Sequence, residues 1–360
     1  MKVAIEARAL VSKGSGVRTY VQELINNLPA GHQYEIIDTE RVPLPHELLI
    51  APWLNFAVGH VLDHIKPDVA HFTKAAVPWR KKYPTVVTIY DLIPILLPES
   101  QKTMARWYWP GTLRRAARTS DHILTISEAS KKDIIDNFEV DPGKITVTPL
   151  AVDLGHFTSP PALSLEKERG LRPYVLFVGT REPRKNVPLL VRAFARIVDQ
   201  IPHDLLIAGR VYKGSEDVER EIMKAGLEDR VKLPGFVDYK ELPGLYAGAD
   251  LLVWPCVYEG WGLPPMEAMA TGTPVIVSDG GSLPEVVGEA GEVVKFATND
   301  LSKRKQDVDF EERLADKMVE VLQDKAKLER MRAAGLVQVR KFSWAEVAKK
   351  TVEVYERVAG

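Results

Sequence analysis

The sequence predicts an α/β fold with two domains, each built around a parallel sheet. Short runs rich in Val, Ile and Leu alternate with helix-length segments throughout, which favours repeated strand-helix-strand units. The chain has 360 residues, more than one hydrophobic core usually supports. A segment rich in Pro, Ser and charge, without a strand pattern, separates two sets of strands. We therefore expect two Rossmann-like domains facing a central cleft.

About six strands are expected in each half of the chain. Those of the first half are residues 2–7 (KVAIEA), 34–38 (YEIID), 68–72 (DVAHF), 85–90 (TVVTIY), 122–127 (HILTIS) and 145–150 (ITVTPL). Those of the second half are residues 174–179 (YVLFVG), 204–209 (DLLIAG), 231–235 (VKLPG), 250–255 (DLLVWP), 274–279 (PVIVSD) and 292–296 (EVVKF).

The domain boundaries follow from this order of strands. We place an N-terminal domain at residues 1–157, a linker at 158–172 (TSPPALSLEKERGLR) and a C-terminal domain at 173–340. Residues 341–360 contain the last helix, which we expect to begin at Ser343 because Ser-Trp-Ala-Glu matches a capping box. Val347, Val352 and Tyr355 are among its apolar positions.

Composition and charge exclude several classes of protein. Apolar residues make up 45% and charged residues 27% of the chain, so long disordered segments are not expected. The net charge of −1 and the lack of zinc-ligand spacing argue against a nucleic-acid partner. The lone Cys256 cannot form an internal disulfide, and the chain opens on a strand without an apolar signal segment. We expect a cytoplasmic protein, since the apolar runs are too short to cross a bilayer.

The most informative segment is YEGWGLPPMEAMATGTPVIVSDGGSLP, residues 258–284, which holds Glu259 and Glu267 eight positions apart. It follows an apolar strand and leads into a helix, where Pro264 or Pro265 suits the first turn. The start of such a helix offers N–H groups to an anion, and carboxylates accept hydrogen bonds from hydroxyls. A nucleotide sugar has both kinds of group. The alternative is two ordinary surface carboxylates near a helix start.

This segment resembles the E-x7-E signature of glycosyltransferase family 4, a family of retaining enzymes with the GT-B fold. The likeness is closest to bacterial mannosyltransferases of polysaccharide assembly, and it runs nearly end to end. It includes GSGVRTYVQEL, TIYDLIPILLPE, ILTISEASKKDI, YVLFVGTREPRKNVPLLVRAF, LPGFVDYKELPGLYAGAD and FSWAEVAKKTVEVY, in this order. The resemblance implies that the terminal helix crosses back onto the first domain. It also implies metal-independent transfer with retention of configuration.

The resemblance assigns roles to several residues around these carboxylates. Glu259 is expected to bind sugar hydroxyls and Glu267 the ribose of the donor. The N–H groups around Gly262 and Leu263 are expected to bind the sugar or phosphate. Lys185, in VGTREPRKN, matches the phosphate-binding lysine of the family and would neutralise the diphosphate in place of a metal ion.

The other residues of the VGTREPRKN loop are less well determined by the resemblance. The family often has arginine directly after the glycine, whereas this chain has Thr180. Arg181 and Arg184 are candidates to compensate for that difference. A metal is not expected, because Asp307 and Asp309, the one formal Asp-x-Asp match, lie in a polar loop before a helix with no apolar strand in front.

Two glycine-containing loops are further candidates for donor binding. By resemblance, the loop with Gly235 and Phe236 binds the nucleobase, although a plain turn after a strand explains it equally well. Gly14 and Gly16 match a dinucleotide fingerprint poorly, since the third glycine is missing. By family analogy they approach the donor phosphates or the acceptor; the alternative is a structural turn.

The segment TIYDLIP shows the main departure from the family pattern. Tyr90 stands where a histidine is common, and a phenol donates a hydrogen bond but gains no positive charge near neutral pH. Asp91 matches the family aspartate and is a candidate to orient acceptor hydroxyls, or else caps the next turn. We expect His71 to be a core histidine and Ser127 an N-cap.

A basic aromatic segment begins at Lys102 and ends at Ser120 (KTMARWYWPGTLRRAARTS). It could rest on anionic lipid headgroups, or it could be a helical pair with its aromatic residues in the core.

The function that best fits these observations is transfer of a hexose, with mannose from GDP-mannose as the first choice, to a hydroxyl of a glycan or glycolipid. Glu259 and Lys185, with Asp91 and Tyr90, are the catalytic candidates. The rivals are a UDP-sugar transferase, a nucleotide-sugar epimerase, a glycan phosphorylase and a GT-B protein that binds without catalysis.

Overall fold

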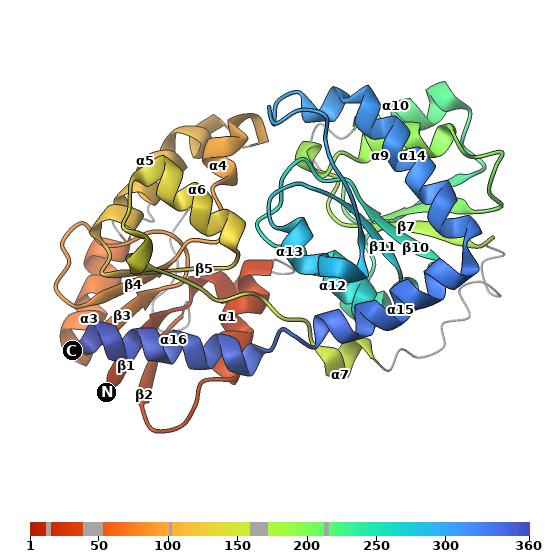
Figure 1. The fold of residues 1–360 in the computed structure, drawn as a ribbon. Coiled ribbons are helices and arrows are strands. Elements are labelled where there is room, and N and C mark those ends of the chain that lie inside the picture. Colours follow the sequence, from red (N-terminus) through yellow and green to blue (C-terminus); the bar gives the residue numbers. More distant parts are fainter. Residues whose placement is uncertain (12–15, 39–52, 101–102, 159–171, 212–215) are drawn as a thin grey trace. The chain divides into compact units, whose positions relative to one another are not determined.

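The protein is described here by a computed structural model that covers residues 1–11, 16–38, 53–100, 103–158, 172–211 and 216–360. Within these residues, twelve strands form two six-stranded sheets (Figure 1). Contacts divide the chain into two compact units, Met1–Leu150 with Ser343–Gly360, and Ala151–Phe342. Each unit contains one sheet.

The first sheet has the strand order β2-β1-β3-β4-β5-β6, and all of its paired strands are parallel. Its strands are β1 (Lys2–Glu6), β2 (Gln33–Ile37), β3 (Val69–Phe72), β4 (Thr85–Thr88), β5 (His122–Thr125) and β6 (Ile145–Val147). The chain order reverses at β1, which lies between β2 and β3, so the loops after β1 and β3 diverge at a topological switch point.

Helices cover both faces of this sheet because parallel strands need crossover connections. The α-helices are α1 (Gly16–Asn26), α3 (Gly59–Ile65), α4 (Ile93–Leu96), α5 (Thr103–Thr119), α6 (Glu128–Phe138) and α16 (Trp344–Ala359). The shorter turns are η1 (Arg8–Val11), the π-helix η3 (Trp53–Val58), η4 (Pro98–Ser100) and η5 (Pro142–Lys144). Helices α3, α5 and α6 share a core with Ala70 and Phe72, whereas α16 packs on Val69 and Val86 from the other face (Figure 1).

The second sheet has the strand order β12-β11-β10-β7-β8-β9, also parallel throughout. Its strands are β7 (Tyr174–Val178), β8 (Asp204–Ala208), β9 (Val231–Gly235), β10 (Leu251–Trp254), β11 (Val275–Ser278) and β12 (Glu292–Val294). Every residue of the four inner strands is buried, as expected for strands covered on both faces. The order reverses between β7 and β10, which makes that pair the switch point.

The helices of the second unit are short where they lead away from the switch point and long toward the C-terminal end. The α-helices are α7 (Leu154–Phe157), α9 (Val187–Ala195), α10 (Glu216–Ala225), α11 (Leu242–Ala247), α12 (Leu263–Ala270), α13 (Leu283–Val287), α14 (Val308–Gln323) and α15 (Lys325–Val339). The 3₁₀ helices are η6 (Pro183–Lys185), η7 (Tyr239–Glu241), η8 (Gly288–Ala290) and η9 (Arg304–Gln306). Helix α9 contacts α10 and α14, and α12 contacts α11, α13 and α15.

The predicted α/β class with two parallel sheets is confirmed, and each observed strand coincides with one of the predicted runs to within one residue at its start. The last helix packs on the first sheet as predicted, and the Ser343 hydroxyl accepts the N-capping hydrogen bond from the N–H of Glu346. None of the described helices has the length and apolar composition of a membrane-spanning segment.

The predicted domain boundary needs a correction, because the second unit begins at Ala151 and not after residue 157. The physical reason is the packing of Phe157, whose ring contacts those of Tyr239 and Tyr246 at centroid distances of 5.8 and 6.0 Å. Residues 159–171 of the predicted linker lie outside the described residues.

Candidate active site

The candidate active site of the second unit is built by two loops that leave the carboxyl ends of β7 and β10. The first loop runs through η6 to Asn186, whose left-handed backbone (φ 59°) turns the chain into α9. The second loop, residues 255–262, leads into α12. The N–H of Val257 donates to the carbonyl of Arg184 at 2.8 Å, so the two loops are joined through their main chains. Because β7 and β10 are neighbours, Lys185 and Glu259 meet despite lying 74 residues apart.

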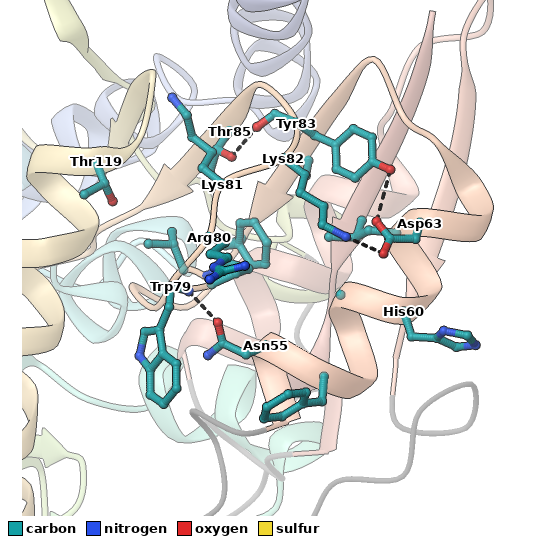
Figure 2. Close-up of a pocket in the computed structure, with 17 residues that line it drawn as sticks. Asn55, His60, Asp63, Trp79, Arg80, Lys81, Lys82, Tyr83, Thr85 and Thr119 are labelled. Carbon is teal, nitrogen blue, oxygen red and sulfur yellow. Dashed lines mark hydrogen bonds and ion pairs between the residues drawn. The ribbon is translucent and has the colours of Figure 1, made fainter.

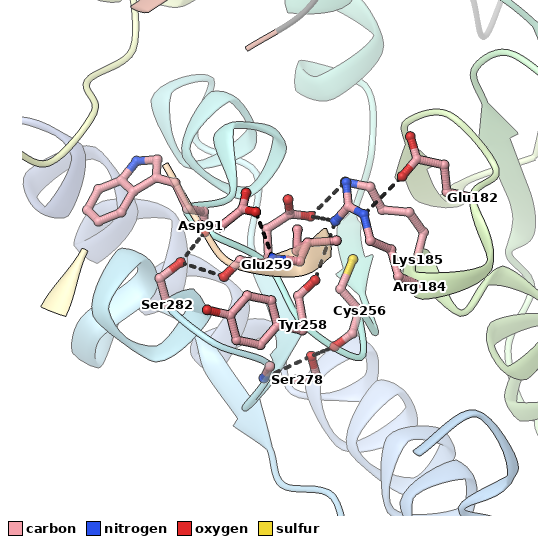
Figure 3. Close-up of polar contacts among 12 residues, drawn as sticks. Asp91, Glu182, Arg184, Lys185, Cys256, Tyr258, Glu259, Ser278 and Ser282 are labelled. Carbon is pink, nitrogen blue, oxygen red and sulfur yellow. Dashed lines mark hydrogen bonds and ion pairs between the residues drawn. The ribbon is translucent and has the colours of Figure 1, made fainter. Parts of the chain in front are cut away.

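An ion cluster occupies this junction (Figure 3). Lys185 Nζ donates to Glu259 Oε2 at 2.7 Å, and Arg184 Nη1 lies 3.0 Å from the same oxygen. Arg184 is itself held by Glu182, whose Oε2 accepts from Nε at 2.9 Å. The side chains of Arg184, Lys185 and Glu259 are only 10–14% exposed. Removing one partner would therefore leave a buried charge poorly compensated.

The neighbouring cations Arg184 and Lys185 keep the carboxyl of Glu259 ionised. Burial alone would raise the pKa of its carboxyl, but the positive charges of Arg184 and Lys185 outweigh burial and hold that pKa at about 2. Glu259 is therefore ionised at any physiological pH. The ammonium of Lys185 also lies 4.2 Å from the ring centroid of Trp254, a cation–π contact that attracts the ammonium to the face of the indole.

The backbone around Glu259 is held by glycines that no larger residue could replace. Glu259 pairs with Gly281 in an isolated parallel bridge, and a Cβ on Gly281 would lie 2.3 Å from the Glu259 carbonyl oxygen. Gly281 also has a φ of +66°, which favours glycine. Gly262 has a φ of +123° at the start of α12, where a Cβ would lie 2.8 Å from Leu283 Cδ2.

The start of α12 supplies N–H groups to the same region. Gly262 has no side chain with which to cap the helix, and Pro264 and Pro265 have no N–H. The N–H groups of Gly262 and Leu263 are thus the ones that this helix start can offer to a ligand, and their predicted role in binding stays a prediction.

Glu267 lies on α12, eight positions after Glu259, and differs from it in protonation. It is half-buried on α12, and burial raises its pKa to about 7, although a hydrogen bond from Tyr246 acts in the opposite direction. The Tyr246 hydroxyl donates to Glu267 Oε2 at 2.7 Å. This carboxyl can thus accept hydrogen bonds from a ligand when ionised and gains a proton near neutral pH.

Two other predicted residues of the second unit, Arg181 and Thr180, do not take part in the ion cluster. Arg181 Nη1 pairs with Glu219 Oε1 on α10 at 2.6 Å, so Arg184, and not Arg181, joins the ion cluster. Thr180 is half-buried in the same loop, where its carbonyl accepts from the N–H of Glu182 at 2.7 Å.

The predicted base-binding loop follows β9. Gly235 has a φ of +79°, and the ring of Phe236 is 57% exposed. The guanidinium of Arg210 lies over that ring, 4.5 Å from its centroid. An exposed aromatic face and a cation therefore occupy the end of the strand next to β8.

In the first unit, the predicted residues at the end of β4 make mainly internal hydrogen bonds. The Tyr90 hydroxyl donates to the carbonyl of Thr73 at 2.7 Å, and burial raises its pKa well above the ordinary value. The phenol therefore uses its single proton within the first unit. Asp91 Oδ1 accepts from the N–H of Ile93 at 2.9 Å, which is the turn-capping contact weighed above.

His71, Ser127 and the glycine pair complete the predicted set in this unit. His71 is fully buried, with Nδ1 2.7 Å from the Tyr355 hydroxyl and Nε2 2.8 Å from Thr88 Oγ1, as expected of a core histidine. Ser127 caps α6 by accepting from Ser130 N at 3.0 Å. Gly16 is the exposed first residue of α1, and Gly14 lies outside the described residues.

The Asp-x-Asp match has a structural role in the second unit. Asp307 is the N-cap of α14, and its two carboxylate oxygens accept from the N–H groups of Phe310 at 2.9 Å and Ala297 at 2.6 Å. Among the described residues, no group of three or more His, Cys, Asp or Glu is placed to hold a metal ion.

Sequence reasoning missed two residues of the candidate active site. Trp254 was assigned only to a strand, yet its ring lies against Lys185, and Tyr246 was not singled out, yet it donates to Glu267. Neither the apolar strand pattern around Trp254 nor the sequence around Tyr246 contains a sign of these contacts. The site thus combines two cations, the ionised carboxylate of Glu259 and the N–H groups at the start of α12, which suit a ligand with both phosphates and hydroxyls.

Solved structures show which class of protein has this fold. A sucrose-phosphate synthase from Thermosynechococcus elongatus matches with a TM-score of 0.77 and 21% identity over 99% of both chains. Anabaena Alr3699/HepE, in complex with UDP-glucose, matches with a TM-score of 0.75 and 18% identity over 99% of this chain and 100% of that chain. The fold is therefore that of the GT-B glycosyltransferases.

Sequence comparison identifies the family. Residues 6–156 match the family model described as Glycosyltransferase Family 4, and residues 166–337 match Glycosyl transferases group 1. The O-antigen chain mannosyltransferase B of Escherichia coli is 33% identical over 279 residues, 75% of this chain and 70% of the relative. The MMP alpha-(1->4)-mannosyltransferase of Mycolicibacterium hassiacum is 32% identical over 288 residues, 76% of this chain and 66% of the relative. The chain belongs to glycosyltransferase family 4, group 1, and is a glycosyltransferase.

Proposed function

We propose that this glycosyltransferase transfers mannose from GDP-mannose to a hydroxyl of a glycan or glycolipid, with retention of configuration and without a metal ion. The observation that carries the proposal is the shared contact of Lys185 and Arg184 with one oxygen of Glu259. Two cations held beside a carboxylate match a donor that has a diphosphate next to a hydroxyl-rich sugar. The names of the mannosyltransferase relatives support mannose as the sugar.

Lys185 and Arg184 would take the part that a divalent cation plays elsewhere. The diphosphate gains negative charge as the bond to the sugar breaks, and fixed positive groups stabilise that charge. One such donor is typically worth about 3–4 kcal/mol of barrier. Because the side chains of these two cations are only 10–14% exposed, solvent screens them less than it would at an open surface, which increases their effect.

The proposed retention does not use a carboxylate nucleophile. Glu259, with a pKa of about 2 and two cations on one oxygen, is a weak base and a weak nucleophile. Because both cations contact Oε2, the other carboxylate oxygen of Glu259 can accept hydrogen bonds from sugar hydroxyls. We therefore propose that the leaving phosphate takes the proton of the acceptor hydroxyl on the same face of the sugar, while Glu267 binds the ribose.

The acceptor side includes a proposed peripheral contact with a membrane through residues 102–120. On α5, the side chain of Trp107 is 82% exposed and that of Tyr108 is 39% exposed, whereas Trp109 packs against the core. Exposed aromatic and basic side chains on one helix favour an anionic lipid surface. Binding to vesicles with and without phosphatidylglycerol checks this proposal.

The proposed donor is tested by thermal shifts across nucleotide sugars, followed by product analysis. We expect GDP and GDP-mannose to raise the melting temperature more than UDP and UDP-glucose, and NAD to leave it unchanged. Transfer to a glycan acceptor should proceed in EDTA and give an α-linked product detectable by NMR. A larger rise in melting temperature with UDP than with GDP would contradict guanine as the nucleobase of the donor. Binding without product or hydrolysis across an acceptor panel would favour a non-catalytic GT-B protein, and product formed without an acceptor would favour an epimerase.

A further inference from the structure

A cavity of about 540 Å³ in the first unit belongs to none of the sites described above. It lies between α3 and the connection from β3 to β4, which crosses without an α-helix (Figure 2). Its floor includes Ala70 and Phe72, which face the side of the sheet opposite α16. Among the described residues, its lining does not include Tyr90 or Asp91. The volume falls within the range of ligand pockets.

Two aromatic side chains are presented at this cavity instead of being buried in the core. The side chain of Trp79 is 61% exposed and that of Phe56, on η3, is 72% exposed. The backbone under Trp79 is held from two sides, because its N–H donates to Asn55 Oδ1 at 2.5 Å and its carbonyl accepts from Arg115 Nη2 at 2.7 Å. Arg115 Nη2 also donates to the carbonyl of Pro78 at 2.9 Å. An exposed indole on a fixed backbone is a pre-organised contact surface.

The polar groups around the cavity are close to neutral as a set. Lys82 Nζ pairs with Asp63 Oδ2 at 2.6 Å, and the Tyr83 hydroxyl reaches the other oxygen of Asp63 at 3.4 Å. Lys81 pairs with Asp121 Oδ1 at 2.5 Å. Arg80, which Figure 2 places between the indole and the Lys82–Asp63 pair, has no ion-pair partner in the part of the chain that the structure describes. Such a lining offers many donors and acceptors but little uncompensated charge.

We propose that this cavity binds an oligosaccharide chain. The apolar faces of sugar rings would lie on Trp79 and Phe56, and their hydroxyls would hydrogen-bond to Arg80 and to the Lys82–Asp63 pair. A nucleotide is a poorer fit, because Lys81 and Lys82 are exposed and each pairs with its own carboxylate, whereas Lys185 and Arg184 are largely buried and share one oxygen of Glu259. A lipid surface is a poorer fit, because the rings border a hollow whose walls carry paired polar groups. This site goes beyond the proposed function, which requires only one acceptor hydroxyl at the reacting sugar.

The experiment is calorimetric titration of the full chain, without any nucleotide, with α-linked mannotetraose and, separately, with maltotetraose. At least one of them is expected to bind, and Trp79→Ala is expected to weaken that binding at least about tenfold, as for loss of an aromatic contact surface. Arg80→Ala should weaken it to a smaller extent. Trp107→Ala, which removes an even more exposed indole from α5, is the matched control and should leave the affinity unchanged. All three changed side chains are exposed, and circular dichroism and the melting temperature verify the fold.

Each outcome bears on one proposal at a time. Binding of maltotetraose but not mannotetraose would support this cavity, because the cavity proposal names an oligosaccharide and leaves its sugar open. No binding of either oligosaccharide, or equal binding by the wild type and Trp79→Ala, would overturn the cavity proposal. Transfer to methyl α-mannoside, measured in parallel, reports on the catalytic proposal alone and should be unchanged in Trp79→Ala. If Trp79→Ala instead lowers only the binding of phosphatidylglycerol vesicles, a lipid contact replaces the proposed glycan site.

Discussion

Two groups of residues near the carboxyl ends of the two sheets differ in charge: Lys185, Arg184 and Glu259 at the second sheet, and Tyr90 and His71 at the first. At the second sheet, Lys185 and Arg184 surround an ionised Glu259. At the first sheet, Tyr90 donates its proton to a main-chain carbonyl, and burial lowers the pKa of His71 to about 3, so that this histidine is neutral.

This difference indicates a division of labour within one chain. Charged groups that are only partly compensated can exchange their partners for a ligand, whereas the hydrogen bonds of Tyr90 and His71 are internal and already made. In the second unit, the proposed function requires a diphosphate to replace Glu259 as the partner of Lys185. In the first unit, the network from His71 to Tyr355 attaches the terminal helix α16 to the sheet.

The largest effect is expected for Lys185→Ala. Losing the ammonium should lower kcat/KM for the donor by roughly 10²–10³-fold, because one electrostatic donor at the departing charge is removed. Steady-state kinetics with GDP-mannose measure this loss. Lys224→Ala, at an exposed lysine of α10, is the control and should behave as the wild type. A Lys185→Ala enzyme with less than a fivefold loss would remove Lys185 from the diphosphate site.

A somewhat smaller effect on turnover is expected for Glu259→Gln. This change should lower turnover without weakening the binding of GDP. Turnover should fall by about a hundredfold, since a carboxylate acceptor for the sugar hydroxyls is lost. GDP itself should bind at least as tightly as before, because Lys185 and Arg184 no longer have Glu259 as an ionic partner. Kinetics and calorimetry on the same preparation test both parts. Weaker GDP binding with normal turnover would contradict the competition between Glu259 and the diphosphate.

A pH effect of about tenfold is expected from Glu267. Burial raises its pKa to about 7, so the carboxyl carries a proton below pH 7 and accepts two ribose hydroxyls only above it. The affinity for GDP should therefore rise about tenfold between pH 6 and pH 8. The nucleotide phosphates titrate in the same way with the wild type and with Glu267→Gln. The part of the rise in affinity that comes from Glu267 should therefore be absent in Glu267→Gln. Identical pH profiles in the two proteins would exclude Glu267 from the ribose site.

The same shift of Glu267 has a consequence for stability. The folded state favours the protonated carboxyl, so this contribution to the free energy of unfolding is present below the ordinary pKa of 4.5 and is lost as the pH rises through about 7. Urea unfolding of the wild type and Glu267→Gln between pH 5 and pH 8 measures the difference.

The smallest effect is expected for Tyr90→Phe. The change removes one hydrogen bond to the Thr73 carbonyl, which should lower the free energy of unfolding by about 1 kcal/mol. Turnover should fall less than tenfold, because the hydroxyl proton already has a partner within the first unit. A loss comparable to that of Lys185→Ala would show that Tyr90 acts on the ligand.

The sequence was sufficient for the strands and for singling out Lys185 and Glu259, but not for predicting that they form an ion pair. Buried parallel strands are continuous apolar runs, so all twelve described strands were predicted from composition and alternation with helices. Glu259 was singled out with Glu267 between an apolar strand and a helix entry, and Lys185 through its match to the phosphate-binding lysine of the family.

The contacts that were missed depend on which elements become neighbours. Tyr246 lies on α11 and Trp254 on β10, and no local pattern indicates that they touch Glu267 and Lys185. The choice between Arg181 and Arg184 was likewise undetermined, because it depends on Glu219 of α10 attracting Arg181. The boundary at Ala151 depends on the long-range packing of Phe157.

A crystal structure of the protein with GDP bound decides whether the ion cluster is the diphosphate site. We expect the Lys185 ammonium within hydrogen-bond distance of a phosphate oxygen, with its 2.7 Å contact to Glu259 opened and Glu267 on the ribose. A diphosphate bound elsewhere, with the Lys185–Glu259 contact intact, would contradict the assignment of this cluster to the donor.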